Sequence, residues 1–223
     1  MKDNKINIVL ILVVVFAISV QAVWAGQGSS GWDVIECANL IYAGTKSSVC
    51  FSDKFLSAVS RDTTVKTSRK FKPVKISDGE LFSYPFAIMT GEGIFSLTEK
   101  ERTNLKRYLE RGGFLLASAG CSNKQWDESF RSEMKLVFPN RRLSDVGTDH
   151  PLFRTVHDIK KLETKGEDAH LEGITICGKL VVVYSPDGLN DTTTMYGCCC
   201  CGGNEIKNSQ QVNSNIIVYA LLQ

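Results

Sequence analysis

The sequence predicts an α/β domain in which a mainly parallel sheet lies between two layers of helices, with a small antiparallel ribbon added. Three observations support this class. Apolar runs of strand length alternate with amphipathic helical patterns through residue 138. The runs at residues 85–90 and 114–119 are typical of parallel strands that are buried on both faces. Residues 171–177 and 179–185 predict two strands joined tightly at Gly178.

The first half of this pattern begins after a Gly/Ser-rich leader. Residues 34–43 predict the first strand, and residues 51–60 predict the following helix, with Ser52 as its cap. Val74 and Ile76 lie in a short extended piece before the strand at 85–90. The order of strand and helix therefore predicts crossover connections of a parallel sheet.

The second half repeats the alternation. A capping box at residues 96–99 starts a helix that Gly112-Gly113 ends, and the strand at 114–119 follows. Residues 120–123 form the turn after that strand, where Ser122 or Asn123 caps a core-facing helix through Phe138. After the ribbon, residues 190–204 predict a long loop and residues 205–222 a last helix. This order predicts a doubly wound, flavodoxin-like three-layer domain.

The amino-terminal segment predicts export. Lys2 and Lys5 precede an apolar run over residues 8–18, and residues 23–25 carry small side chains at the positions that a signal peptidase reads. We therefore expect a signal peptide at residues 1–25 and one domain at residues 26–223, located in the periplasm or secreted. The alternative is an uncleaved membrane anchor, because residues 8–25 approach the ~20 residues that span a bilayer.

Charge excludes some partners. The chain of 223 residues has a formal net charge of only +2 at pH 7. A net charge this small creates no strong electrostatic field that would attract nucleic acid or anionic lipid, so we expect no nucleic-acid partner. Membrane contact is expected only through an uncleaved signal segment. An envelope protein or a small molecule remains as the expected kind of partner.

Several phrases occur together in order along the chain. They lie at residues 81–86, 90–93, 107–115, 130–135, 137–139, 149–153 and 215–221. Together these phrases resemble a bacterial family of exported domains of unknown function, number four-one-five-nine, whose fold is related to class I glutamine amidotransferases. The resemblance implies a class I glutamine amidotransferase-like three-layer fold and brings no established reaction. Where the family has His in a Thr-Gly-His-Gly phrase this chain has Glu92, and Ser118 and Ala119 replace an acidic pair.

Cys121 is the candidate nucleophile, because it follows a buried strand at the edge where open α/β sheets bind ligands. In amidotransferase-like folds, a cysteine at a strand-to-helix turn attacks a carbonyl with the help of a histidine base. His150 is the candidate base, and Glu92 is the candidate group that orients it. A structural turn at Asp149-His150-Pro151 is the alternative for the histidine.

Four consecutive cysteines, Cys198, Cys199, Cys200 and Cys201, form the rarest local feature. Adjacent side chains of an extended segment point in opposite directions, and adjacent cysteines pair poorly with each other. Distant partners are therefore expected, either as disulfides to Cys37 and Cys50 or as a site for zinc or another thiophilic metal shared with distant cysteines. Redox or catalytic thiols are the third alternative.

The missing family histidine and acidic pair weigh against catalysis. The sequence therefore favours a non-catalytic binding or assembly module of the cell envelope. A Cys121-dependent hydrolase or amidotransferase-like enzyme is the first alternative, and a cysteine-cluster metal or redox protein is the second.

Overall fold

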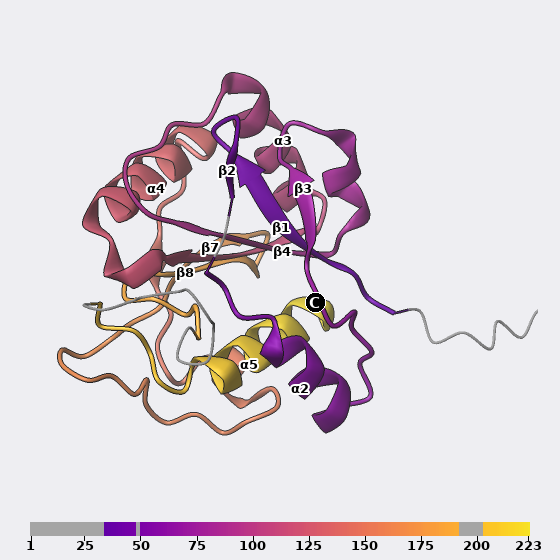
Figure 1. The fold of residues 1–223 in the computed structure, drawn as a ribbon, viewed down its shortest axis with the longest axis vertical. Coiled ribbons are helices and arrows are strands. Elements are labelled where there is room, and N and C mark those ends of the chain that lie inside the picture. Colours follow the sequence, from indigo (N-terminus) through magenta and orange to yellow (C-terminus); the bar gives the residue numbers. More distant parts are fainter. Residues whose placement is uncertain (1–33, 48–49, 192–202) are drawn as a thin grey trace, which may run out of the picture. The chain divides into compact units, whose positions relative to one another are not determined.

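A computed structural model describes residues 34–47, 50–191 and 203–223. The predicted signal peptide, at residues 1–25, and the four consecutive cysteines lie outside these described residues. Within the described ranges, no helix combines the length and the apolar character needed to cross a membrane. The described chain forms an eight-stranded sheet with helices on both of its faces (Figure 1).

The sheet is mixed and mostly parallel. Neighbouring strands follow the order β2-β1-β4-β5-β8-β7-β6, and β3 pairs with β1. Strands β3, β1, β4, β5 and β8 pair in parallel, whereas β2, β6 and β7 pair antiparallel to their neighbours. The strands are β1 (Cys37–Tyr42), β2 (Lys46–Ser47), β3 (Lys72–Lys75), β4 (Phe86–Gly91), β5 (Phe114–Ala119), β6 (Ser144–Asp145), β7 (Glu172–Ile176) and β8 (Lys179–Ser185). The predicted α/β class with a mainly parallel sheet is therefore confirmed.

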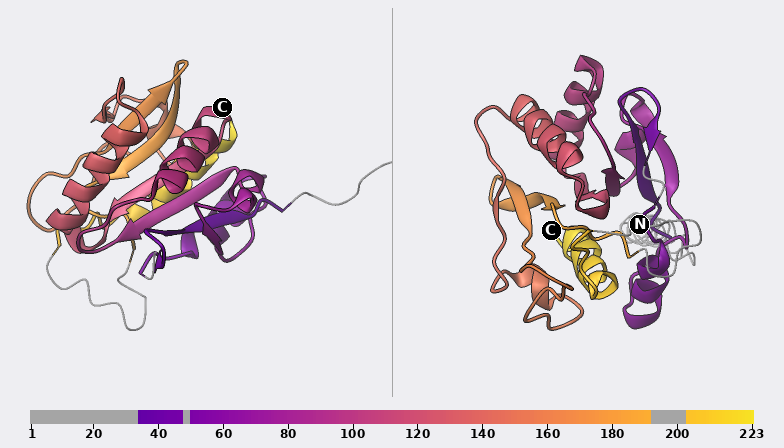
Figure 2. Two further views of the ribbon diagram at one scale, coloured as in Figure 1. Left: turned by 90° about the horizontal axis from the view of Figure 1, so that it is seen from above. Right: turned by 60° about the vertical axis from the view of Figure 1, so that its left-hand side comes forward.

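In the described part of the chain, four α-helices cover the sheet. Helices α3 (Glu99–Glu110) and α4 (Lys124–Val137) pack on one face, and α2 (Lys54–Asp62) and α5 (Ser209–Leu221) pack on the other (Figure 2). Alternate residues of β4 pack against the two helix layers. Ala87 and Met89 face α3 and α4, whereas Phe86 and Ile88 face α2 and α5. This use of both faces explains the unbroken apolar run that marks β4 in the sequence.

Two helix starts differ from the prediction. The capping box of α3 is Thr98 with Glu101, not Ser96 with Glu99. The Ser96 hydroxyl instead donates to Glu133 Oε1 at 3.0 Å, which fixes the α3–α4 layer. Helix α5 begins at Ser209 rather than near residue 205, because the backbone of Ile206 donates to Gly188 O at 3.0 Å. Long-range partners therefore decide both boundaries.

The ribbon prediction is confirmed, with one addition. Strands β7 and β8 are antiparallel and meet at Cys177-Gly178, where both residues have positive φ. Strand β8 also pairs in parallel with β5. One strand of the ribbon thus belongs to the parallel sheet, and β7 and β6 extend that sheet outward.

Candidate functional site at the carboxyl edge of the sheet

Polar side chains meet where three neighbouring parallel strands end. Thr90, Ser118 and Ser185 occupy aligned positions on β4, β5 and β8, and all three are buried. The side chain of Asn190 joins two of them: Ser118 Oγ donates to Asn190 Oδ1 at 2.6 Å, and Asn190 Nδ2 donates to Thr90 Oγ1 at 3.1 Å. The backbone of Leu189 also donates to Ser118 Oγ at 2.7 Å. Burial is therefore compensated by a connected network.

A cavity of about 290 Å³ lies in front of this network. Its lining comes from the end of β4, the β2 region and the turn after β5. The lining residues are Ser47, Cys50, Thr90, Gly91, Glu92, Gly120 and Asn190. The cavity thus lies at the carboxyl ends of the strands, the usual place for ligands in open α/β sheets.

An aromatic pair packs against Gly91, which lines the cavity. Trp126 Nε1 donates to the Tyr42 hydroxyl at 2.8 Å, and that hydroxyl donates to Thr90 O at 3.0 Å. A Cβ atom at position 91 would lie 2.9 Å from Trp126 Nε1 and closer still to the Tyr42 hydroxyl, so only glycine fits. Burial raises the pKa of Tyr42 to about 12, which keeps the hydroxyl protonated as a donor at neutral pH.

The turn after β5 is strained. Cys121 has φ 50° and ψ 33°, and Ser122 has φ 53°, so two consecutive residues other than glycine adopt left-handed conformations. Contacts from other segments hold them there. Ser122 Oγ donates to Asp187 O at 2.6 Å and accepts from the backbone of Asn204 at 2.7 Å. Asn123 then caps α4, as predicted, by accepting from the backbone of Trp126 at 3.0 Å.

The structure brings two of the three predicted catalytic residues to this edge. Glu92 lies beside the turn that carries Cys121, because a Cβ atom at position 120 would be 3.3 Å from Glu92 Cγ. His150 lies elsewhere. Its ring packs against Tyr219 at 5.3 Å, and Tyr219 hydrogen-bonds the backbone of Leu180, at the amino end of β8.

Local contacts give His150 a structural setting. Its Nδ1 accepts from the backbone of Leu152 at 3.2 Å at the start of the 3₁₀ helix Pro151–Arg154. Burial lowers its pKa, against an opposing effect of Asp149. Five residues of β8 separate Leu180 from the strand's carboxyl end, a span of ~16 Å. His150 therefore does not accompany Cys121.

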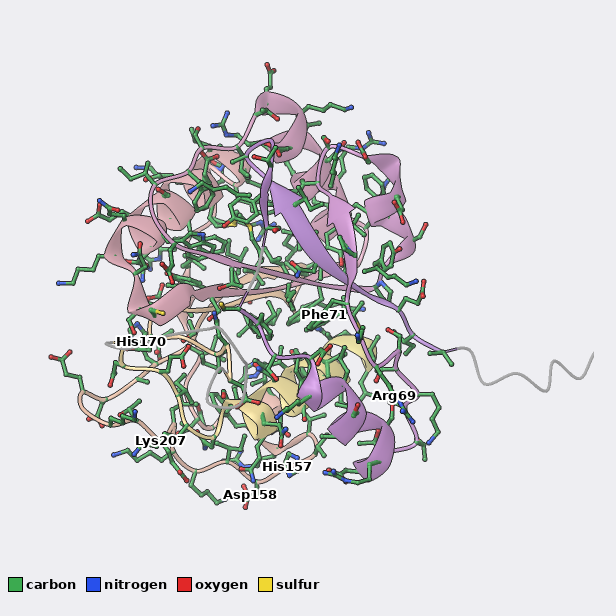
Figure 3. All side chains as sticks on the ribbon, in the orientation of Figure 1. Arg69, Phe71, His157, Asp158, His170 and Lys207 are labelled. Atoms are coloured by element: carbon green, nitrogen blue, oxygen red, sulfur yellow. The ribbon has the colours of Figure 1, made fainter. Side chains whose placement is uncertain are left out.

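Another histidine, His170, is connected to the Cys121 turn, and no sequence pattern pointed to it. His170 Nε2 lies 3.0 Å from Glu172 Oε1, and His170 Nδ1 lies 3.8 Å from the carboxylate of Asp187, whose carbonyl binds Ser122. Figure 3 shows His170 and His157 at separate places in the molecule. Burial opposes ionisation of Glu172, but hydrogen bonds from Arg131 and His170 outweigh it and lower the pKa of this carboxyl.

The described cysteines lie at different places. Cys37 is wholly buried at the amino end of β1, and burial raises the pKa of its thiol to about 12. Cys50 lines the carboxyl-edge cavity, and Cys177 is exposed in the β7–β8 turn. In the part of the chain that the structure describes, no group of three or more His, Cys, Asp or Glu side chains could hold a metal ion. A metal at Cys198 to Cys201 stays a prediction, because these residues are outside that part.

Comparison with known families agrees with the sequence resemblance. A family model described as a domain of unknown function, DUF4159, matches residues 38–221, from the second residue of β1 to the last residue of α5. No curated protein matches the chain. Since the match covers nearly all of the described residues, the chain belongs to the DUF4159 family.

Proposed function

We propose that this protein is an exported, non-catalytic binding module of the cell envelope, and that its ligand occupies the cavity at the carboxyl edge. One observation carries the proposal: a cavity of about 290 Å³ lies directly against the hydrogen-bonded network of Ser118, Asn190 and Thr90. A network whose groups are satisfied by one another holds its geometry before a ligand arrives, which favours binding.

The topology supports this position for the ligand. The parallel strands follow the spatial order β3-β1-β4-β5-β8, which corresponds to the flavodoxin-like order 2-1-3-4-5. In that arrangement the strand order reverses between β1 and β4, and ligands bind beyond the carboxyl ends at this point. Gly91 and Glu92 at the end of β4, with Ser47 and Cys50 after β1, line the cavity there.

The lining favours a small ligand that donates hydrogen bonds. It includes Glu92 and Ser47, whose side chains can accept hydrogen bonds, and the cavity volume lies just below the range of ~300–1,000 Å³ that is common for small-molecule sites. Lys46 Nζ donates to Glu92 O at 3.3 Å, and this hydrogen bond restrains the backbone at Glu92. Amines and sugar hydroxyls have the matching chemistry.

Amide chemical shifts test the proposal. D-glucosamine, L-glutamine and D-alanyl-D-alanine would each be titrated into ¹⁵N-labelled protein. We expect at least one probe to shift the amides of Gly91, Gly120 and Asn190 in a saturable way. Ser47→Trp should block these shifts by filling the mouth of the cavity. Glu128→Gln, on the exposed side of α4, is the control that should leave them unchanged.

A second candidate function is thioester chemistry at Cys121. The left-handed turn favours it, because strained strand-to-helix turns present nucleophiles in hydrolases. With p-nitrophenyl acetate, the Cys121 thiolate would attack the ester carbonyl, release p-nitrophenolate and leave an acetyl thioester that water hydrolyses. A stoichiometric burst that Cys121→Ser abolishes, without any saturable shift from the three probes, would replace the binding module by this enzyme.

A further inference from the structure

A second cavity lies far along α4 from the Cys121 turn. It has a volume of about 350 Å³ and lies between the last two turns of α4, the loop at residues 139–143 and strand β7. Its floor is apolar. Met134 and Ile174 are almost fully buried there, and Leu143 packs against the same core. An apolar floor of this kind suits a ligand with a hydrocarbon portion.

The rim of this cavity is cationic. Arg131, Lys135, Arg141 and Arg142 line it, and none of the lining residues is acidic. Helical spacing places Arg131, Met134 and Lys135 on one side of α4. A rim of one sign around a low-dielectric floor concentrates the electrostatic potential, although the whole chain has a formal net charge of only +2.

Among the residues that the structure describes, most of this positive charge has no counter-ion. Arg131 is the exception: it pairs with Asp127 at 2.7 Å and forms a double contact with Glu172 at 2.7 and 2.8 Å. Lys135, Arg141 and Arg142 form no ion pair within the described ranges. Three cationic side chains therefore face a cavity without a carboxylate to balance them.

The loop that carries two of these cations is held in place. The backbone of Arg141 donates to Phe138 O at 3.0 Å, directly after α4 ends. Its Nη1 atom donates to Thr175 O at 2.8 Å, which fastens the loop to β7. These two hydrogen bonds hold Arg141 in place, so it would move little when a ligand binds. Its other guanidinium nitrogens keep the fork geometry that matches carboxylates and phosphates.

We propose that this cavity is a binding site for a small amphiphilic organic anion, with a phosphate or carboxylate group at the cationic rim and a short apolar portion on the floor. Charge complementarity selects the anion, and Met134, Leu143 and Ile174 select the apolar portion. The site is independent of the carboxyl-edge cavity, because the two cavities share no lining residue.

Calorimetric titration of the folded protein tests this site with hexyl phosphate and hexanoate. We expect one saturable site for at least one of them, weaker binding of methyl phosphate, which lacks the apolar chain, and no binding of hexanol, which lacks the charge. Affinity should fall as salt rises. The double variant Lys135→Gln/Arg142→Gln should weaken binding about tenfold or more, as loss of charged hydrogen bonds predicts.

Arg69→Gln is the matched control, because Arg69 is an exposed cation (Figure 3). It precedes β3, which pairs with β1 near the opposite end of the sheet from β7. The control variant should leave the affinity unchanged. The exposed positions of Lys135 and Arg142 predict that thermal unfolding of the double variant stays close to wild type. Equal binding by wild type and double variant would overturn the proposal, as would equal weakening by Arg69→Gln. Binding of hexaglutamate without either alkyl anion would also overturn it, in favour of an acidic protein segment.

Discussion

The two ends of the parallel strands differ in chemistry. At the amino end, Cys37, Phe86 and Phe114 lie in register, and the two phenylalanine rings stack with centroids 5.8 Å apart. At the carboxyl end, aligned Thr90 and Ser118 bind Asn190 in front of a cavity. The amino end is therefore built to exclude water, whereas the carboxyl end presents a prepared polar surface. We infer that stability depends mainly on the first end and ligand recognition on the second.

Left-handed backbone occurs at both ends of the strands. Cys121 and Ser122 lie directly after β5, whereas Cys177 lies in the turn before β8, at the amino end. Such conformations persist only where other contacts impose them. At the carboxyl end these contacts come from Asp187 and Asn204. The two consecutive left-handed residues directly follow Gly120, which lines the cavity, and this position fits a binding role for the carboxyl end.

The largest expected effect concerns the cysteines at the two ends. We predict that a cysteine of the quartet at residues 198–201 pairs with Cys50, at the carboxyl edge, rather than with Cys37. The backbone of Ser52 donates to Asn190 O at 2.8 Å, so Cys50 lies near the residues that precede the quartet, whereas Cys37 is wholly buried at the other end. Closing so long a loop stabilises by about 4–5 kcal/mol in the chain-entropy model.

Non-reducing peptide mapping and elemental analysis check this pairing. Reduction should lower the free energy of unfolding of wild type and of Cys37→Ala, and leave Cys50→Ser unchanged. Stoichiometric zinc, copper or iron with free thiols would replace the disulfide by a metal site. Eight unmodified thiols without metal would contradict both.

The next largest loss of stability is expected when a buried side chain at the amino end of the parallel strands is shortened. Phe86→Ala removes a fully buried ring that stacks on Phe114, and it should destabilise the protein by about 3–5 kcal/mol. Urea unfolding measures this loss. Binding at the carboxyl edge should persist in the folded fraction. Loss of probe binding without loss of stability would contradict the division between the two ends.

The third prediction concerns alkaline pH. The Cys37 thiol has its pKa raised from 9.0 to about 12 by burial, so the folded state keeps a proton that the unfolded state loses. This contribution is complete below pH 9 and is lost as pH rises from 9 toward 12, with a slope of about 1.4 kcal/mol per pH unit. Urea unfolding between pH 8 and 10.5 should therefore show a shallower decline for Cys37→Ala than for wild type. Parallel curves would contradict the burial of this thiol.

Tyr42→Phe should have a smaller effect, at the carboxyl end. The substitution removes the acceptor of the buried Trp126 Nε1–H and the donor to Thr90 O, and should cost about 1–3 kcal/mol. Thermal unfolding measures it. Because this pair packs against Gly91, probe shifts at Gly91 should also change. Phe86→Ala is the comparison, since it should alter stability without altering those shifts.

Local chemistry made part of this fold predictable. The apolar runs of β4 and β5 predict buried strands because both faces of each strand are covered, and Asn123 predicts a helix start because its side chain caps the next turn. Cys177-Gly178 forms the expected tight turn. The resemblance also predicted the family correctly, and the strand pattern predicted that Cys121 and Glu92 follow neighbouring strands.

Contacts between distant residues made the rest unpredictable. Asn190 reaches Thr90 across 100 positions of sequence, and no local pattern distinguishes it from another loop residue. The sequence predicted a turn at His150. The ring of His150 packs against Tyr219, near the amino end of β8 and away from Cys121. Ser96 and Thr98 both precede an acidic residue at capping distance, and only the contact of Ser96 with Glu133 decides between them.

A crystallographic fragment screen would show at which end of the sheet small molecules bind. Crystals would be soaked with small amines, sugars and amides, and the bound positions compared between the two ends of the sheet. We expect fragments to gather in the cavity bounded by Ser47, Glu92 and Gly120, within reach of the Ser118–Asn190–Thr90 network. Fragments bound over Cys37, Phe86 and Phe114, with none at the carboxyl edge, would contradict this expectation.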